Sequence, residues 1–190
     1  MRGQSPVEQP YLFPILHSDD NNDNAAQKSA LCWNGECYSY DANYNHKMEN
    51  GNTNTRHSRD MVDLLPSTTP HEQSDTVLVA KLIRDAITAC TLALDEEHRA
   101  ISEAMGRIHG EFSFILFAST SNCVYWGRDC IGRRSLLSNK SMHGFVAVSS
   151  VAITESDEGF VPNGNNDWEE IPPGIVYKLD ASTGEVTSIP

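Results

Sequence analysis

The segment from Glu111 to Phe117 limits the possible folds of this chain more than any other. In a β-strand, successive side chains point to opposite faces of the sheet. Both faces of this segment are apolar, with Phe112, Phe114 and Leu116 on one and Ile115 and Phe117 on the other. A strand of this kind has to be covered on both sides. The segment therefore predicts a layered domain.

Two helices are predicted ahead of this strand. Ser74 is a residue type typical of a helix N-cap, and Asp75 puts a negative charge in the first turn, where the helix dipole favours it. Apolar residues then recur at helical spacing, namely Val79, Ile83, Ile87, Cys90 and Leu94. A second helix is predicted over 96–108, with Gly110 as its stop signal.

Further strands are predicted at 123–126, 134–137, 145–150, 174–179 and 185–189, because Gly, Asn, Ser and Pro separate these apolar runs. A helix pair combined with many strands indicates an α+β domain in which sheet packs on sheet and helices close the outside. The segments 17–27 and 41–73 are polar and without period, so both are predicted to be surface loops, the second a long polar insertion. The chain, 1–190, is predicted to be one domain.

The composition argues against several classes of protein. The chain has 190 residues, of which 39% are hydrophobic, and this is enough for a core. A formal net charge of -12 argues against binding of nucleic acid. No apolar run is long enough to span a membrane, and no signal-peptide pattern opens the chain. We therefore expect a cytoplasmic protein with no nucleic-acid or membrane partner.

The cysteines favour a reduced protein without a structural metal. Their number is odd and most have apolar neighbours in the sequence: Cys32, Cys37, Cys90, Cys123 and Cys130. Buried thiols are therefore expected rather than disulfides. None forms a Cys-x-x-Cys pair, and no Cys/His cluster has the spacing of a zinc site.

Asn34 and Gly35 allow two interpretations. Asn-Gly is a strong signal for a tight hairpin turn, because both residues accept a positive φ at low cost. Alternatively, the Asn34 amide and the Gly35 N–H form a pair of donors suited to a carbonyl oxygen that becomes negative. The dipeptide alone favours the hairpin, since most such turns do no chemistry.

The order of several short motifs resembles class II glutamine amidotransferase domains. These motifs are Leu31–Glu36, Ser74–Thr76, Gly110–Phe114, Gly127–Asp129 and Gly132–Leu137. The closing stretch Trp168–Tyr177 is similar to the end of this domain in asparagine synthetases. The form Gly-Arg-Arg-Ser-Leu-Leu at 132–137 differs from ordinary asparagine synthetases and is more similar to an asparagine synthetase-like subgroup.

The resemblance implies a four-layer αββα fold of the N-terminal nucleophile type and hydrolysis of the glutamine side-chain amide. In that family an N-terminal Cys thiol attacks the amide, and its α-amino group acts as the base. Ammonia then passes to a C-terminal synthetase domain that uses ATP and makes asparagine. The implied partners are glutamine and that synthetase domain. No cofactor is expected in this domain, and ATP and Mg²⁺ are expected only in the synthetase domain.

The resemblance also implies roles for five residues. Asn34 and Gly35 fall on the oxyanion hole, and Asp75 falls on the acid that pairs with the ammonium of bound glutamine. Arg2 is similar to the arginine that holds the glutamine carboxylate. Glu36 is similar to a residue that lines the glutamine pocket, or else it is a solvated carboxylate.

Other polar and sulfur residues near these motifs are predicted to be structural. Arg128 and Asp129 are expected to form an ion pair that shapes a turn. The pair Arg133 and Arg134 is expected to be solvated. Cys32 and Cys37 are interpreted as inert core residues and not as substitute nucleophiles.

The sequence departs from the family at its first residues. The family begins Met-Cys-Gly, whereas this chain begins Met1-Arg2-Gly3, with no cysteine nearby. The nucleophile and the first strand of the fold are therefore expected to be absent from these 190 residues. Two explanations are open: an N-terminally truncated fragment of a longer amidotransferase, which we favour, or a short protein that keeps the fold as a silent binding or scaffold module.

Overall fold

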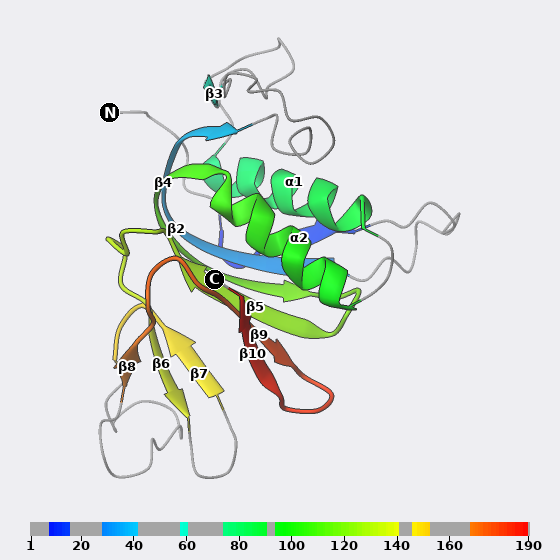
Figure 1. The fold of residues 1–190 in the computed structure, drawn as a ribbon, viewed down its shortest axis with the longest axis vertical. Coiled ribbons are helices and arrows are strands. Elements are labelled where there is room, and N and C mark those ends of the chain that lie inside the picture. Colours follow the sequence, from blue (N-terminus) through cyan, green and yellow to red (C-terminus); the bar gives the residue numbers. More distant parts are fainter. Residues whose placement is uncertain are drawn as a thin grey trace, which may run out of the picture.

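A computed structural model describes residues 8–15, 28–41, 58–60, 74–90, 94–140, 146–152 and 168–189. Most of the described strand residues belong to one large antiparallel sheet (Figure 1). Its strands are β1 (Tyr11–Pro14), β2 (Lys28–Asp41), β4 (Ile108–Ala118), β5 (Cys123–Arg128), β9 (Val176–Asp180) and β10 (Val186–Ile189), which lie side by side in this order. The short strand β3 (Ser58–Asp60) pairs with the end of β2.

Two helices, α1 (Asp75–Thr88) and α2 (Leu94–Gly106), cover one face of this sheet (Figure 1). The start of α1 is confirmed, because the Ser74 hydroxyl accepts a hydrogen bond from the Thr76 N–H at 3.2 Å. Apolar residues of both helices and of β1, β2 and β4 form one core, which includes Leu31, Trp33, Val79, Ile83, Ile101, Phe112, Phe114 and Leu116.

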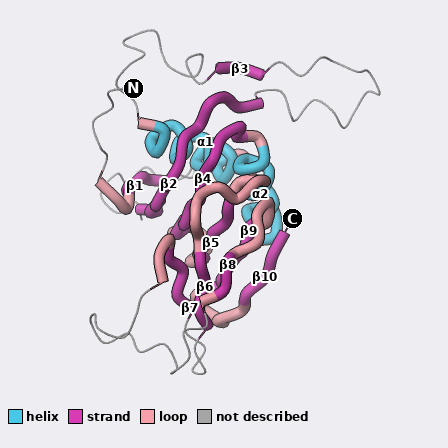
Figure 2. The backbone as a smooth tube through the Cα atoms, turned by 90° about the vertical axis from the view of Figure 1, so that its left-hand side faces the viewer, coloured by secondary structure: helices cyan, strands magenta, loops and turns pink. Residues whose placement is uncertain are grey.

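A second, three-stranded sheet lies on the other side. It consists of β6 (Leu137–Lys140), β7 (Val146–Ser149) and β8 (Glu169–Glu170), with β6 in the middle. In Figures 1 and 2 this sheet is at the lower end of the molecule, away from α1. A second apolar cluster joins the two sheets, with Trp126, Leu136 and Ile171 buried and Ile115, Val124 and Val148 packed against them. The described layers are therefore helices, large sheet and small sheet.

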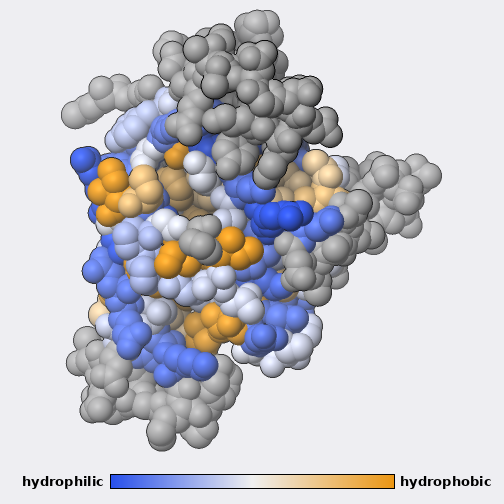
Figure 3. All heavy atoms as spheres, in the orientation of Figure 1, coloured by the Kyte–Doolittle hydropathy of each residue, from blue (hydrophilic) through white to orange (hydrophobic). Residues whose placement is uncertain are grey.

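This arrangement confirms the α+β prediction and the double cover of the 111–117 segment. Phe112, Phe114 and Leu116 face the helices, whereas Ile115 contributes to the cluster between the sheets. On the face shown in Figure 3, apolar side chains form small areas separated by hydrophilic ones. The apolar groups that drive folding are thus mainly between the layers.

The hairpin predicted at Asn34 and Gly35 is wrong, because β2 continues through both residues as one strand. Gly35 is needed for the close approach of two strands and not for a turn. A Cβ at Gly35 would lie 2.2 Å from the Glu111 carbonyl oxygen, and a Cβ at Gly110 would lie 2.1 Å from the Glu36 carbonyl oxygen. Glycine at both positions therefore allows β2 and β4 to approach closely.

Other boundaries differ from the predictions. The second helix ends at Gly106 instead of 108, because Ile108 already pairs with Tyr40 in the sheet, and Gly110 is a strand residue and not a helix stop. Strands β1 and β8 were not predicted. The predicted insertion 41–73 contains β3, and most of its other residues and all of the predicted loop 17–27 lie outside the described residues.

The turn after β5 connects the two sheets. The predicted ion pair between Arg128 and Asp129 is wrong, since the buried Arg128 guanidinium pairs with Glu170 at 2.6 Å and donates to the Ile171 carbonyl oxygen at 2.9 Å. The Asp129 carboxylate accepts backbone N–H groups from Phe112 at 2.9 Å, Ile131 at 2.8 Å and Gly132 at 2.9 Å. Arg128 therefore holds the small sheet, and Asp129 holds the turn against β4.

Burial raises the pKa of the Asp129 carboxyl, but hydrogen bonds from backbone N–H groups, the first from Phe112, outweigh this effect and lower the pKa below its usual value. A lowered pKa in the folded state stabilises the protein at pH values above the unfolded-state pKa. This contribution is lost as the pH falls through the folded-state pKa.

We predict that Gly110→Ala lowers the free energy of unfolding by about 3 kcal/mol, because β2 and β4 have to separate to admit the methyl group. Gly106→Ala is the control: no atom lies within 4 Å of its added Cβ, so its effect is neutral or slightly stabilising. Urea denaturation followed by circular dichroism measures both. Equal stability of the two variants would contradict the close approach of the strands.

We predict that Asp129→Asn lowers the free energy of unfolding by about 2 kcal/mol at pH 7, because buried backbone donors lose a charged acceptor. The difference in unfolding free energy between wild type and variant becomes smaller below about pH 4, as the wild-type carboxyl becomes protonated. Denaturation at several pH values measures the gap. Asp180→Asn, at the end of β9, is the control, because its carboxylate also accepts from backbone N–H groups, those of Ser182 and Thr183, but at an exposed place. A gap that stays constant down to pH 2 would refute the role of the charge.

Candidate functional site

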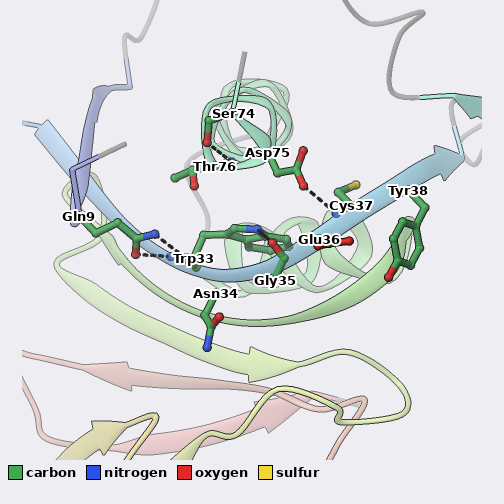
Figure 4. A pocket seen from close by; sticks show the side chains of 10 residues that line it. All are labelled: Gln9, Trp33, Asn34, Gly35, Glu36, Cys37, Tyr38, Ser74, Asp75 and Thr76. Carbon is green, nitrogen blue, oxygen red and sulfur yellow. Dashed lines mark hydrogen bonds between the residues drawn. The ribbon is translucent and has the colours of Figure 1, made fainter. Parts of the chain in front are cut away.

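A cleft of about 630 Å³ lies at an unpaired part of the β2 edge. On this edge β1 pairs with residues 28–31 of β2, and β3 pairs with residues 39–41. The cleft occupies the interval between them, below the first turn of α1 (Figure 4). Its lining consists of Gln9, Trp33, Asn34, Gly35, Glu36, Cys37, Tyr38, Ser74, Asp75 and Thr76.

Backbone groups of β2 point into this cleft. The N–H and C=O of Phe112, which is opposite Gly35 in β4, both bond to Asp129, at 2.9 and 3.0 Å. Gly35 and Phe112 are therefore a non-hydrogen-bonded pair, in which the backbone groups of each residue point away from the other strand. The Gly35 N–H consequently points to the edge of β2, at a place that no described strand covers.

The carboxylate of Asp75 lies at the same edge. Asp75 begins α1, and its Oδ2 accepts a hydrogen bond from the Cys37 N–H at 3.0 Å. A carboxylate has several acceptor sites, so Asp75 can also accept from a ligand ammonium. The hydrogen bond fixes the first turn of α1 against β2 and so fixes the position of the charge.

Asn34 and Glu36 lie on the other face of β2. Side chains alternate along a strand, so Trp33 and Cys37 point toward the helices and Asn34 and Glu36 point away from them. Figure 4 shows Asn34 directed away from Asp75. Both Asn34 and Glu36 are exposed. The cleft thus extends around the edge of the strand and reaches both faces of the sheet.

Four of the predicted site residues line one cleft: Asn34, Gly35, Glu36 and Asp75. Arg2 lies outside the described residues. The cleft also contains residues that were not predicted, among them Gln9 and Trp33. Trp33 stands beside the Asn-Gly motif, whereas the position of Gln9 depends on the pairing of β1 with β2, which has no local sequence signal.

Next to the cleft, Glu36 and Glu111 are directly opposite each other on β2 and β4. Two carboxylates in this relation repel each other. Arg133 and Arg134 offset the repulsion, since they contact Glu111 at 3.3 and 2.8 Å. The prediction that these arginines are solvated is therefore wrong for Arg134, which is half-buried and paired.

The cysteines near the cleft are not activated as nucleophiles. Cys37 is buried, and its thiol donates to the Ser39 carbonyl oxygen at 3.7 Å. Burial raises the pKa of the Cys32 thiol and so lowers the fraction of thiolate. Within the described part of the chain, no group of three or more His, Cys, Asp or Glu residues is arranged to hold a metal ion.

The layered fold is one found in glutamine amidotransferases. The described structure is similar to glutamine phosphoribosylpyrophosphate amidotransferase from B. subtilis, with a TM-score of 0.54 and 18% identity over 95% of this chain and 31% of that chain. It is also similar to a structure titled an allosteric regulatory enzyme of purine biosynthesis, with a TM-score of 0.51 and 17% identity over 95% of this chain and 30% of that chain. At these identities the likeness concerns the fold.

In sequence, the chain is similar to asparagine synthetase domain-containing protein 1. It is 28% identical to the Bos taurus protein over 88 residues, which are 46% of this chain and 13% of the relative. It is 27% identical to the Homo sapiens protein over 110 residues, which are 57% of this chain and 15% of the relative. Both likenesses support the resemblance inferred from the motifs, although the chain spans a small part of these relatives.

No family model matches the chain. Neither of the two described helices is long and apolar enough to cross a membrane.

Proposed function

We propose that this chain is the glutamine-binding part of an amidotransferase domain in an asparagine synthetase-like protein. In the whole protein this domain would supply ammonia from glutamine for asparagine biosynthesis in the cytoplasm. The observation that carries the proposal is the cleft at the open edge of β2, where the Gly35 N–H and the Asp75 carboxylate face the same space.

The proposed ligand lies across the edge of β2. Its ammonium bonds to Asp75, and its side-chain carbonyl accepts from the Gly35 N–H and the Asn34 amide. Because Asn34 and Asp75 are on opposite faces, the ligand has to bridge the edge, and glutamine carries its ammonium and its amide at opposite ends. In this proposal Arg2 holds the α-carboxylate, and Glu36 lines the part of the cleft near the amide.

The proposal assigns no nucleophile to these 190 residues. Cys32 and Cys37 are the thiols near the cleft, and neither is activated. Without a thiolate and its base there is no route to an acyl intermediate, so the donors at Gly35 and Asn34 recognise the amide without hydrolysing it. No cofactor is needed for this step. ATP and Mg²⁺ belong, in this proposal, to the synthetase domain of the longer protein.

A second candidate function is a catalytically silent module that binds glutamine or serves as a scaffold. The raised pKa of Cys32 and the burial of Cys37 favour it, since both leave the cleft without a reactive thiol. The two candidates share the cleft and differ in whether hydrolysis occurs in the longer protein. Binding and ammonia release therefore have to be measured separately.

We predict that the chain binds L-glutamine and that Asp75→Asn weakens binding at least tenfold, because the ammonium loses a charged partner worth roughly 1.5–3 kcal/mol. The variant keeps an oxygen acceptor for the Cys37 N–H, so its unfolding free energy changes by less than about 1 kcal/mol. Titration calorimetry and thermal unfolding measure the two effects. Wild type that gives no heat with glutamine would refute the glutamine site and leave the scaffold.

We predict that the purified chain releases no ammonia from glutamine at concentrations that saturate binding. A coupled glutamate dehydrogenase assay measures release, and Cys32→Ala and Cys37→Ala are the matched variants. Their traces should be identical to that of the wild type, because neither thiol attacks the amide. Turnover that either substitution abolishes would show that one of these thiols is the nucleophile.

A further inference from the structure

The side chain of Gln9 pairs with the backbone of β2 as a strand residue would. Its Oε1 accepts a hydrogen bond from the Trp33 N–H at 2.9 Å, and its Nε2 donates to the Trp33 carbonyl oxygen at 2.5 Å. Gln9 comes two residues before β1, which pairs with β2 up to Leu31. The Gln9 side chain thus extends the pairing along this edge from Leu31 to Trp33. Gly35 is the next residue of β2 whose backbone groups point to the same edge.

Trp33, whose backbone Gln9 holds, also contacts the backbone of Gly35. Its ring is stacked on Phe112, with 4.7 Å between centroids and 22° between planes, and its indole N–H donates to the Gly35 carbonyl oxygen at 3.2 Å. The Gly35 N–H belongs to the peptide between Asn34 and Gly35. The preceding peptide is held at the Trp33 carbonyl by Gln9, and the following peptide is held at the Gly35 carbonyl by the indole.

We propose that Gln9 is a positioning residue for the Gly35 N–H, which recognises the side-chain carbonyl of the ligand. This role rests on the function proposed above and adds to it a determinant of specificity for an amide or other side-chain carbonyl. Gln9 does not touch the carbonyl. It fixes the Trp33 backbone, so that the Gly35 N–H, which bonds to no other described residue, keeps one direction. Glycine needs such support because its own backbone is permissive.

The test compares two ligands on three proteins. L-Glutamine has the side-chain carbonyl, and L-norvaline has the same ammonium and carboxylate but no side-chain carbonyl. Gln9→Met keeps the length of the side chain and removes both hydrogen bonds to Trp33. Glu8→Met puts the same side chain at the neighbouring exposed position and is the control. Calorimetry measures the two affinities, and ¹H–¹⁵N NMR follows the Gly35 amide.

Wild type and Glu8→Met are expected to prefer glutamine roughly three- to tenfold, which is the usual range for a neutral hydrogen bond. Glutamine, but not norvaline, should move the Gly35 amide proton downfield. In Gln9→Met the preference for glutamine falls severalfold, to what the Asn34 amide alone supplies, with norvaline bound as before, and the downfield shift is lost. A general loss of structure would instead weaken both ligands equally and would contradict a positioning role.

The outcomes separate this inference from the proposed function. If wild type prefers glutamine and Gln9→Met keeps the same ratio, Gln9 does not position Gly35, and the glutamine site stands. If wild type binds neither ligand, the proposed function fails and the role of Gln9 fails with it. If wild type binds both ligands equally, the Gly35 N–H does not bind the side-chain carbonyl. The inference about Gln9 is then overturned together with the amide contact of the proposed function, and only the ammonium contact with Asp75 stands.

Discussion

The close approach of β2 and β4 is the constraint on which the rest of the structure depends. The two strands pair from Ala30 to Tyr40, and at Gly35 and Gly110 the backbones leave no space for a Cβ. This pairing fixes which residues of β2 face the helices and which face away. A slip of one residue would exchange Trp33 with Asn34 and put a polar amide into the helix-facing core. The glycines therefore determine the register as well as the distance.

Asp129 determines how the paired strands present their backbones. The Asp129 carboxylate accepts from the Phe112 N–H, and the Asp129 N–H donates to the Phe112 carbonyl oxygen. Because Phe112 pairs with Gly35, these two bonds hold the turn after β5 against β4. Arg128, the neighbouring residue, holds the end of β8 in the small sheet through Glu170 and Ile171. Asp129 therefore contacts the large sheet, whereas Arg128 contacts the small one. The expected ion pair between these two neighbours does not form.

The sequence predicted those features that depend on local preference or on burial. The Ser74 cap and the doubly apolar strand at 111–117 follow from side-chain chemistry alone, and the structure has both. The hairpin prediction at Asn34 and Gly35 failed because the preference of Asn-Gly for a turn is local, whereas β2 pairs with β4 on both sides of these residues, from Ala30 to Tyr40. Glycine suits both a hairpin turn and a close approach of two strands, so only the residues that surround Gly35 in space distinguish the two.

In the candidate site, too, some residues could be predicted from sequence motifs, whereas others depend on contacts between distant segments. The resemblance of motifs brought Asn34, Gly35, Glu36 and Asp75 together without any knowledge of their geometry, and these residues line one cleft. The contribution of Gln9 could not be found in this way, since it depends on a hydrogen-bonded contact with a residue 24 positions away. The direction of the Gly35 N–H was equally hidden, because it depends on the pairing of Gly35 with Phe112, whose backbone groups bond to Asp129 on the far side of β4.

Recognition and chemistry have different origins in such a cleft. The Gly35 donor is a backbone group, so it exists wherever β2 and β4 pair in this register. Asp75 is held by a hydrogen bond that also fixes α1 on the sheet. Both groups are therefore products of the fold, whereas a nucleophile is one additional side chain with its own base. Under the proposed function, a chain with this fold can keep the ability to recognise an amide without the ability to cleave it, because the first depends on the sheet edge and the second does not.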